Sequence, residues 1–574
     1  MQTELDRAGH DPQRGVLRIQ WGFRGAMALF ALIDCWITRF KMDPDGVSYL
    51  DMGDRYWRGD WHNALNAYWS PLYGWLTGLM FRLTKPSMRW EYPEVHLLNF
   101  AIFVAALISF EFFWRGLLES RTENAWTGAS RPYAWVLGYL LFAQMYFGGA
   151  FKYAWGGDEL ALVTPDLLVA ALAYLVFGMI LRFSAGRLSV AFSCLMGITL
   201  GVAYLTKTAM LPFGVFVLAT MLAVSWKRRA GMRQTGLALL CFLAISTAFV
   251  AALSWNNHRF TYGDAGKLNI AWSVNGAWPR YIHWQGQEAV PTHPLHPSRK
   301  MLNWPEVYEF ATPVAGTYPP WYDPTYWTAG ADTRPDPLRE VIRFKQNMID
   351  LALYLLGPAG IPTAMVLTVF FLGDRTGSSW RQFRKFLPIL APAIALLLMY
   401  GMLIFEPRYL SWAILAGLCS LIASTSISAE EQRLRVFRAA SLALGAMLVG
   451  APLHILISSQ SESRTSAQYV EAAEQLRVMG LEPGSRVAVI GDGITEEFWA
   501  RLDRVQIVAE VPRTLATGNS ADAFWTSGLD GEQAVLNALK STGEKAVIAD
   551  IEPKTLPPGW VPLGNTEHAV YFFR

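Results

Sequence analysis

Acidic residues gather where the first strongly apolar stretch of the chain ends. The segment FKMDPDGVSYLDMGDRYWRGDW, which starts at residue 40, holds five aspartates. A carboxylate placed there can accept the proton of a hydroxyl nucleophile, which is general-base chemistry. Asp43 and Asp45 come first and are the candidates for that role. We expect Asp51, Asp54 and Asp60 to be solvated positions on the helix that follows.

Other charged side chains stand almost alone in short links between apolar stretches: Lys152, Asp158, Asp166, Lys207 and Arg408. The three cations suit a phosphate, because ammonium and guanidinium groups are its usual partners. The two acids suit a second carboxylate that positions a hydroxyl. Alternatives stay open: both acids can instead cap a helix or face solvent, and long cationic side chains can reach the membrane surface from a helix end.

The composition is that of a membrane protein. Of 574 residues, 52% are hydrophobic and only 17% are charged, whereas soluble domains have about a quarter charged residues. The net charge of +3 gives no reason to expect nucleic acid as a partner. The cysteines all lie in apolar segments, so neither disulfides nor a zinc framework is predicted. They are Cys35, Cys194, Cys241 and Cys419.

Apolar runs near the length of a membrane-spanning helix, about 20 residues, recur along the first 460 positions. The eleven candidates lie near 22–40, 94–116, 132–149, 163–182, 188–206, 208–226, 234–254, 346–372, 386–404, 409–427 and 438–458. The first is the weakest because it holds Arg24 and Asp34. Thr206-Lys207-Thr208 is predicted to be a tight hairpin between two spans. The leader before the first run lacks a small-residue cleavage pattern, so we expect an uncleaved first span.

The charges of the loops predict an orientation. With a cytoplasmic N-terminus, each inner loop carries arginine or lysine near a helix end, as the positive-inside rule requires. Residues 41–93, 255–345 and all those after 459 then face the outside of the inner or plasma membrane. The second of these segments is rich in tryptophan and proline, which suits an aromatic surface at lipid headgroups or along a sugar cleft. We expect the first outer helix to be anchored at the membrane surface by Trp57, Trp61, Trp69 and Tyr73.

The chain changes character near its end. Three stretches are predicted to be short buried strands with helical segments between them: SRVAVIGDG, RVQIVAEV and KAVIAD. We therefore expect a mainly α, polytopic domain over residues 1–460 and a small extracytoplasmic, periplasmic α/β domain over 461–574. The VIGDG stretch also fits a nucleotide loop, but a lone Gly-x-Gly is weak evidence and a plain strand-to-helix turn is predicted.

Short motifs in the first outer segment resemble the GT-C glycosyltransferases, which include protein O-mannosyltransferases and aminoarabinose transferases. They are Asp45-Gly-Val-Ser-Tyr49, Gly59-Asp60-Trp61 and Trp69-Ser-Pro71-Leu72-Tyr73. The resemblance continues at Thr164-Pro165-Asp166, at the Lys207 hairpin and at Glu406-Pro407-Arg408-Tyr409. It covers the order of features over most of the predicted membrane domain, although each motif is short and degenerate.

The resemblance implies transfer of a sugar from a polyprenyl-phosphate carrier to an acceptor hydroxyl on a lipid, glycan or protein, with inversion. A phosphate leaving group needs positive charge rather than a general acid. Asp45 is then the base with Asp43 as runner-up, and Asp158 or Asp166 positions hydroxyls. The implied phosphate ligands are Lys207, Arg408 and Lys152, and the implied substrate or interface residues are Tyr49, Trp69, Tyr73 and Tyr409. No cofactor is required, although Asp43 and Asp45 permit a divalent metal.

Two departures from the family pattern bear on these roles. Trp69 and Ser70 stand where aminoarabinose-type enzymes place a lysine, and Gly46 follows Asp45 where the family has a second acid. Three other functions compete with glycosyl transfer: a transporter or flippase, a different membrane transferase such as an O-antigen ligase or an acyltransferase, and a non-catalytic partner of cell-envelope polysaccharide assembly. A transporter predicts internal repeats, which the sequence does not show convincingly. A ligase does not need an acidic loop directly after the first span.

Overall fold

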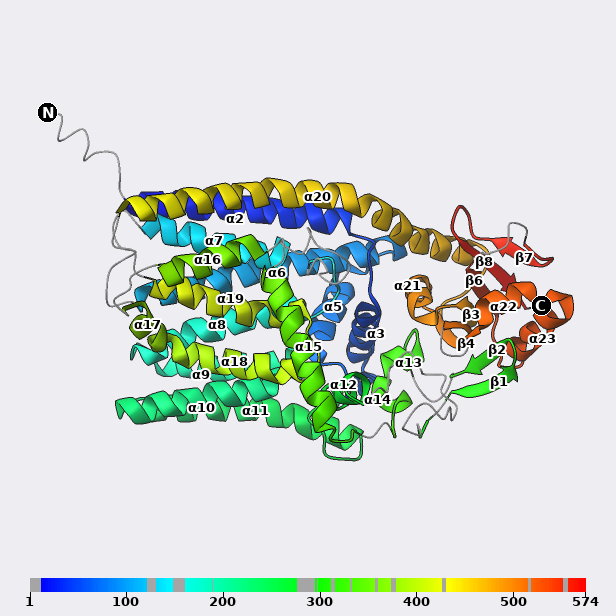
Figure 1. The fold of residues 1–574 in the computed structure, drawn as a ribbon. Coiled ribbons are helices and arrows are strands. Elements are labelled where there is room, and N and C mark those ends of the chain that lie inside the picture. Colours follow the sequence, from blue (N-terminus) through cyan, green and yellow to red (C-terminus); the bar gives the residue numbers. More distant parts are fainter. Residues whose placement is uncertain are drawn as a thin grey trace.

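The computed structural model divides the chain between a bundle of long helices and an α/β part at one end of that bundle (Figure 1). It describes residues 12–120, 131–147, 160–187, 189–275, 295–296, 298–310, 315–330, 333–356, 360–372, 378–425, 430–514, 518–550 and 556–573. The predicted site residues Lys152 and Asp158 lie outside this described part of the chain.

The bundle consists of helices that run roughly side by side. They are α2 (Pro12–Ile37), α6 (Met88–Glu119), α7 (Arg131–Phe147), α8 (Asp166–Ser184), α9 (Val190–Thr206), α10 (Met210–Arg228), α11 (Met232–Asn256), α16 (Ile361–Leu372), α18 (Leu387–Gly401), α19 (Pro407–Ser424) and α20 (Glu430–Val478). Within the described residues, seven helices are long and apolar enough to cross a membrane. These helices support a multi-pass membrane protein, and the prediction of a polytopic, mainly helical chain is confirmed.

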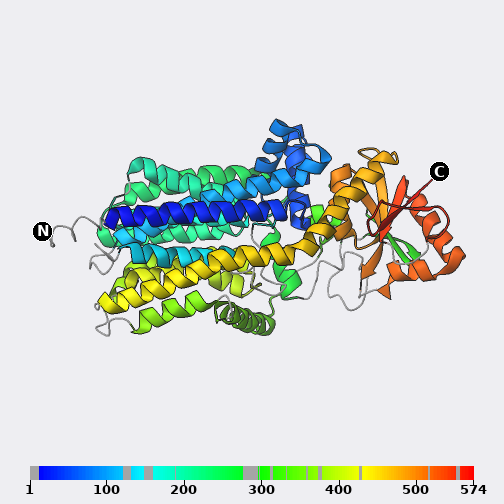
Figure 2. The same cartoon turned by 90° about the horizontal axis from the view of Figure 1, so that it is seen from above.

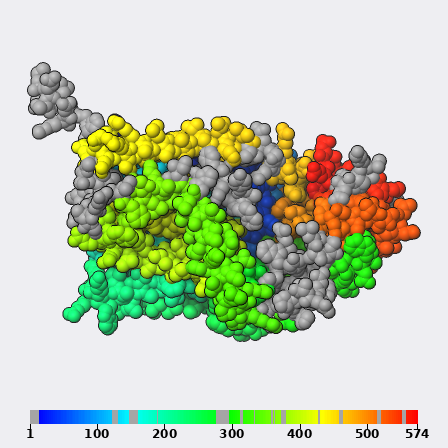
Figure 3. All heavy atoms as spheres, in the orientation of Figure 1, coloured from blue at the N-terminus to red at the C-terminus, as the bar shows by residue number. Residues whose placement is uncertain are grey.

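One predicted span is not a single helix in the structure. Residues 346–372 form the end of α15 (Pro337–Leu356) and the separate helix α16. The sequence between them contains Gly357-Pro358, and a proline disfavours the helical conformation of the residue before it. α15 lies obliquely across the outside of the bundle, as Figures 1 and 3 show.

A polar contact inside the bundle explains the charge in the first span. The Arg24 guanidinium on α2 donates a hydrogen bond of 2.9 Å from Nε to Glu111 Oε1 on α6. The Tyr139 hydroxyl on α7 donates to the same carboxylate oxygen at 2.8 Å. Charged groups within a membrane bundle are expected to face one another in this way. Glu111 therefore links α6 to α2 through Arg24 and to α7 through Tyr139.

Helix α3 (Pro44–Arg58) is the element that carries the first acidic residues. It begins after the N-cap Asp43 with Pro44 at its first position, and it ends at Gly59 in the left-handed conformation. It packs closely on α5 (Pro71–Thr84), with the short α4 (Trp61–Ala64) between them. A Cβ on Gly53 of α3 would lie 2.4 Å from the carbonyl oxygen of Gly74 on α5. Glycine therefore lets the two backbones touch, and this contact fixes where α3 lies.

Gly53→Ala is expected to lower stability by about 1–3 kcal/mol, since an added methyl group must push α3 away from α5. The measurement is thermal unfolding of the protein in detergent. Gly25→Ala on α2 is the matched control, because a Cβ there meets no atom within 4 Å and alanine favours a helix intrinsically. Equal melting temperatures for the two variants would contradict the close contact.

The α/β part is a mixed sheet with helices packed on it. Its strands are β1 (Arg299–Asn303), β2 (Glu306–Glu309), β3 (Arg486–Gly491), β4 (Gln506–Thr514), β5 (Gly518–Asn519), β6 (Ala546–Asp550), β7 (Trp560–Pro562) and β8 (His568–Phe572). The order is β1-β2-β4-β3-β6-β8-β7, with β5 paired to β4. β3 is parallel to β4 and β6, and the other described pairs are antiparallel. The predicted α/β character of the end of the chain is confirmed.

Three connections join the two parts. β1 and β2 belong to the segment predicted as the second outer loop, yet they extend the sheet of the C-terminal segment. α20 is continuous over 49 residues and runs from the bundle to the α/β part (Figure 2). The VIGDG stretch is a strand-to-helix turn, as predicted, between β3 and α21 (Gly493–Asp503), and α21 packs against α3. The helices α22 (Ser520–Thr526) and α23 (Gly528–Lys540) complete this part.

Candidate functional site

Four of the predicted site residues meet beside the start of α3. Arg408 Nη2 lies 3.5 Å from Asp45 Oδ2, and Arg408 Nη1 lies 3.8 Å from Asp166 Oδ2. Lys207 Nζ donates to Asp166 Oδ1 at 2.5 Å. The side chains of Asp45, Lys207 and Arg408 are 21–23% exposed, whereas that of Asp166 is 4% exposed. These four charged side chains form one partly exposed cluster. Asp166 is its buried residue and contacts both cations.

Helix starts position these residues. Asp45 lies in the first turn of α3, Asp166 is the first residue of α8, and Arg408 follows Pro407 at the start of α19. Lys207 is the first residue of the three-residue link between α9 and α10, which confirms the tight hairpin predicted there. The unpaired N–H groups and the dipole of a helix start favour an anion. Three helix starts therefore bring Asp45, Asp166 and Arg408 to one site.

Tyr409 holds the two cations from one side. Its ring centroid lies 3.3 Å from Lys207 Nζ and 5.0 Å from the guanidinium carbon of Arg408. Its hydroxyl oxygen accepts a hydrogen bond of 3.2 Å from Arg408 Nη2. Cation–π contacts of this kind orient a charged group without neutralising it. Tyr409 thus orients the two cations without removing their charge.

The predicted aromatic residues of the first loop lie behind the site rather than at the membrane surface. Tyr49, Trp69 and Tyr73 are buried, and the Tyr49 ring packs edge to face on the other two rings at 5.3 and 5.4 Å. The Tyr73 hydroxyl donates to Asn99 Oδ1 at 2.7 Å. The expectation of interfacial anchoring is therefore wrong for Trp69 and Tyr73, because both are buried. Trp69 Nε1 donates to the carbonyl oxygen of Tyr322 at 3.1 Å, and Tyr73 packs on α6. Trp57 and Trp61 are exposed.

Asp43 has a different environment from Asp45. Its Oδ1 accepts the backbone N–H of Gly46 at 2.9 Å, and its Oδ2 accepts that of Val163 at 2.7 Å. Burial, followed by the negative charge of Asp45, raises the pKa of Asp43 to about 6. Asp43 thus caps α3 and ties it to the segment before α8. Both contacts help to place Asp45.

The expectation that Asp51 and Asp54 are solvated is wrong. Arg501 of α21, whose side chain is 3% exposed, lies 2.7 Å from Asp51 Oδ1 and 2.9 Å from Asp54 Oδ2. Its Nε donates to Glu91 Oε1 at 2.8 Å, and Arg504 pairs with Asp54 and Glu91 as well. The physical reason is that α21, hundreds of residues away in sequence, covers the face of α3 that carries these acids. No local pattern around Arg501 signals this contact.

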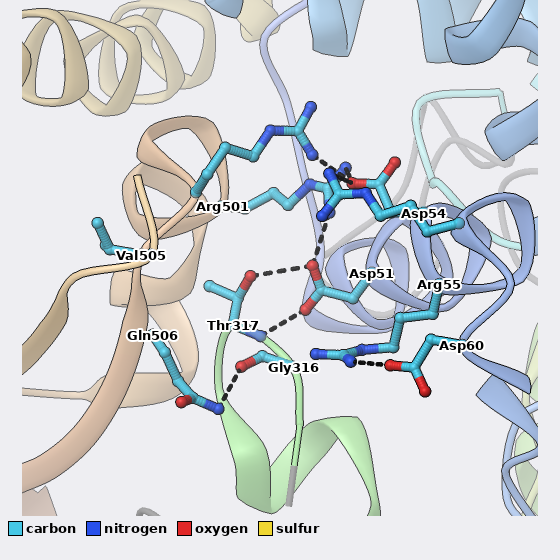
Figure 4. Close-up of a pocket in the computed structure, with 12 residues that line it drawn as sticks. Asp51, Asp54, Arg55, Asp60, Gly316, Thr317, Arg501, Val505 and Gln506 are labelled. Carbon is cyan, nitrogen blue, oxygen red and sulfur yellow. Dashed lines mark hydrogen bonds and ion pairs between the residues drawn. The ribbon is translucent and has the colours of Figure 1, made fainter. Parts of the chain in front are cut away.

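A cavity of about 320 Å³ opens beside these ion pairs (Figure 4). It is lined by Asp51, Asp54, Arg55, Arg58, Asp60, Gly316, Thr317, Gly484, Arg501, Arg504, Val505 and Gln506. Asp51 accepts the Thr317 hydroxyl at 3.0 Å. Asp60 remains partly exposed, as predicted, but it also caps α4 and pairs with Arg55 at 2.6 Å. The acids of the cavity wall are therefore occupied by cations of the same wall.

Comparisons with known proteins found similar solved structures but no similar sequence family. No protein-family model and no curated protein sequence matches the chain. The solved structures that match include ArnT from Cupriavidus metallidurans bound to undecaprenyl phosphate, at 15% identity and a TM-score of 0.51 over 95% of this chain and 96% of that one. They also include the Archaeoglobus fulgidus oligosaccharyltransferase in its apo form, at 13% identity and a TM-score of 0.42 over 92% and 69%. The likeness to ArnT over nearly the whole of both chains shows that this protein has the GT-C-type fold that its motifs predicted.

Proposed function

We propose that this chain is an integral membrane glycosyltransferase that moves a sugar from a polyprenyl-phosphate carrier to an acceptor hydroxyl at the outer face of the membrane, with inversion. The observation that carries the proposal is the position of Arg408, held between Asp45 and Asp166 with Lys207 on the same Asp166 carboxylate. A bound lipid phosphate in the ArnT structure, which shares the fold, supports a donor of this class.

The proposed reaction is a single displacement. The acceptor oxygen forms a bond to the anomeric carbon while the bond from that carbon to the carrier phosphate breaks, and the electron pair leaves on the phosphate. Lys207 and Arg408 stabilise the charge that develops there. Asp45 orients the acceptor hydroxyl and takes its proton. Attack on the face opposite the leaving group inverts the configuration.

Asp166 acts by holding the cations in place. It is the most buried charged group of the site and touches both Lys207 and Arg408. A carboxylate behind two cations keeps them charged and fixes their separation, which prepares the site before the phosphate arrives. We therefore propose for Asp166 a positioning role in the reaction rather than proton transfer.

The residues present do not fit a divalent metal at Asp43 and Asp45. Both oxygens of Asp43 already accept backbone N–H groups, and Arg408 faces Asp45. Lys207 and Arg408 would repel a metal cation placed between these carboxylates. We therefore derive no step through a metal at this site.

The test is consumption of labelled polyprenyl-phosphate sugars by the purified protein in lipid vesicles. Arg408→Ala is expected to lower turnover by about 10²- to 10³-fold, as the loss of one electrostatic stabiliser does in other enzymes. Arg233→Ala is the matched control, since Arg233 is also the second residue of a bundle helix, is exposed, and lies at the far end of α10 from Lys207. Wild-type turnover by Arg408→Ala, or no consumption of any such donor, would overturn the proposal.

A further inference from the structure

A second group of ionisable side chains lies in the α/β part, away from the proposed transfer site. Glu496 is in the first turn of α21, Asp550 is the last residue of β6, and His568 is the first residue of β8. One donor atom from each lies within 4.8 Å of the other two. His568 Nε2 is 3.2 Å from Glu496 Oε2 and 3.6 Å from Asp550 Oδ1.

We propose that Glu496, Asp550 and His568 bind a divalent transition-metal ion of the zinc class. Imidazole nitrogen and carboxylate oxygens bind Zn²⁺ at about 2.0–2.2 Å in a tetrahedral arrangement, which puts neighbouring ligand atoms about 3.4 Å apart. The two distances from His568 Nε2 lie on either side of that value. Three protein ligands leave a fourth position for water, and Asp550, with 26% of its side chain exposed, lies on the side open to solvent.

Neighbouring groups hold the carboxylates in a suitable orientation. Trp499 Nε1 donates to Glu496 Oε2 at 2.6 Å. Arg513 Nη1 donates to Asp550 Oδ2 at 3.1 Å, which leaves Oδ1 directed at His568. Such outer partners orient metal ligands and tune their affinity. Glu496 and His568 have side chains only 2% and 6% exposed, so the site is prepared without large side-chain movement.

The position in the sheet agrees with a ligand site. β3 and β6 are parallel neighbours, so the turn before α21 and Asp550 meet at the carboxyl end of both strands. Ligands of open α/β sheets bind in this crevice. Glu496 is buried and Asp550 is partly buried, and negative charge in such places is costly unless it is paired. Arg513 pairs with Asp550, and a divalent ion would add positive charge next to both carboxylates.

The proposed ion would connect with the transfer site through α21. Glu496 and Arg501 lie on this same helix, five residues apart, and Arg501 holds the acids of α3. A metal that joins α21 to β6 and β8 would fix the helix from which Arg501 reaches α3. The inference does not depend on the proposed transfer reaction, because it concerns binding of the ion alone.

The test uses the full-length protein in detergent, treated with a chelator and then titrated with Zn²⁺ by calorimetry. One Zn²⁺ per chain is expected, together with visible absorption of Co²⁺ bound in a low-coordinate nitrogen and oxygen environment. Glu496→Gln, Asp550→Asn and His568→Gln should each weaken Zn²⁺ binding by about tenfold or more, since even outer partners of metal ligands contribute 10- to 100-fold. The controls are Asp530→Asn and His62→Gln, which replace exposed residues.

Thermal unfolding separates loss of the ion from loss of the fold. Zn²⁺ should raise the unfolding temperature of the wild type and of both controls, because a ligand that binds only the folded state stabilises it. It should not raise that of His568→Gln. Absence of saturable Zn²⁺ binding by the wild type, or equal binding by the three site variants and the controls, would overturn the proposal.

Discussion

Asp45→Asn is expected to lower glycosyl transfer by about 10²- to 10⁴-fold, the range that a positioned general base contributes. The amide keeps the size of the carboxylate but cannot take the proton of the acceptor hydroxyl. Lys207 and Arg408 remain in place because Asp166, rather than Asp45, contacts both of them. The donor should therefore still bind, and the loss should appear in kcat with little change in the KM for the lipid-linked sugar.

Asp43→Ala is the matched control for this prediction. It removes an acid two residues away that caps α3 and accepts the Val163 N–H, and losing an N-cap costs about 0.5–2 kcal/mol of stability. The variant should melt at a lower temperature and yet retain far more turnover than Asp45→Asn. If Asp43→Ala were the inactive variant and Asp45→Asn the active one, the base would be Asp43.

Arg501→Ala is expected to destabilise the protein by about 3–5 kcal/mol, as the removal of one partner from a buried ion pair does. Asp51 and Glu91 would be left buried without their main cation. Arg501 of α21 contacts α3 at Asp51, further along that helix than Asp45, so any fall in turnover would come through the position of α3. The measurement is thermal unfolding in detergent, together with limited proteolysis to detect separation of the α/β part from the bundle.

Arg58→Ala provides the comparison at the same interface. Arg58 is 72% exposed and lies 3.8 Å from Asp54, and exposed pairs contribute about 0–1 kcal/mol. The Arg501→Ala and Asp51→Asn changes should also be non-additive, because they remove two partners of one contact. Additive effects, or equal melting temperatures for Arg501→Ala and Arg58→Ala, would show that α21 does not hold α3 through this pair.

The sequence by itself determined the membrane helices, except that 346–372 is two helices rather than one, and the order of the charged links between them. Apolar runs of sufficient length form helices in a bilayer because every backbone polar group must be satisfied within the segment. The Lys207 hairpin follows from the same requirement, since the run that it interrupts is too long for one span. The residue types at helix starts, such as Asp166 and Arg408, could therefore be picked out without knowledge of their neighbours.

The tertiary structure alone decided which of those residues touch and which acids are buried. Asp45 and Arg408 are 363 residues apart in sequence, and no local pattern tells that Asp166 rather than Asp45 pairs with Lys207. The aspartates of α3 look alike in sequence, yet α21 covers Asp51 and Asp54. Burial depends on which distant element packs on a face, and α21 is itself held by a sheet that includes strands from two separated segments. Local sequence sets the helices and their ends, whereas the environment of each charge is set by packing between elements far apart in the chain.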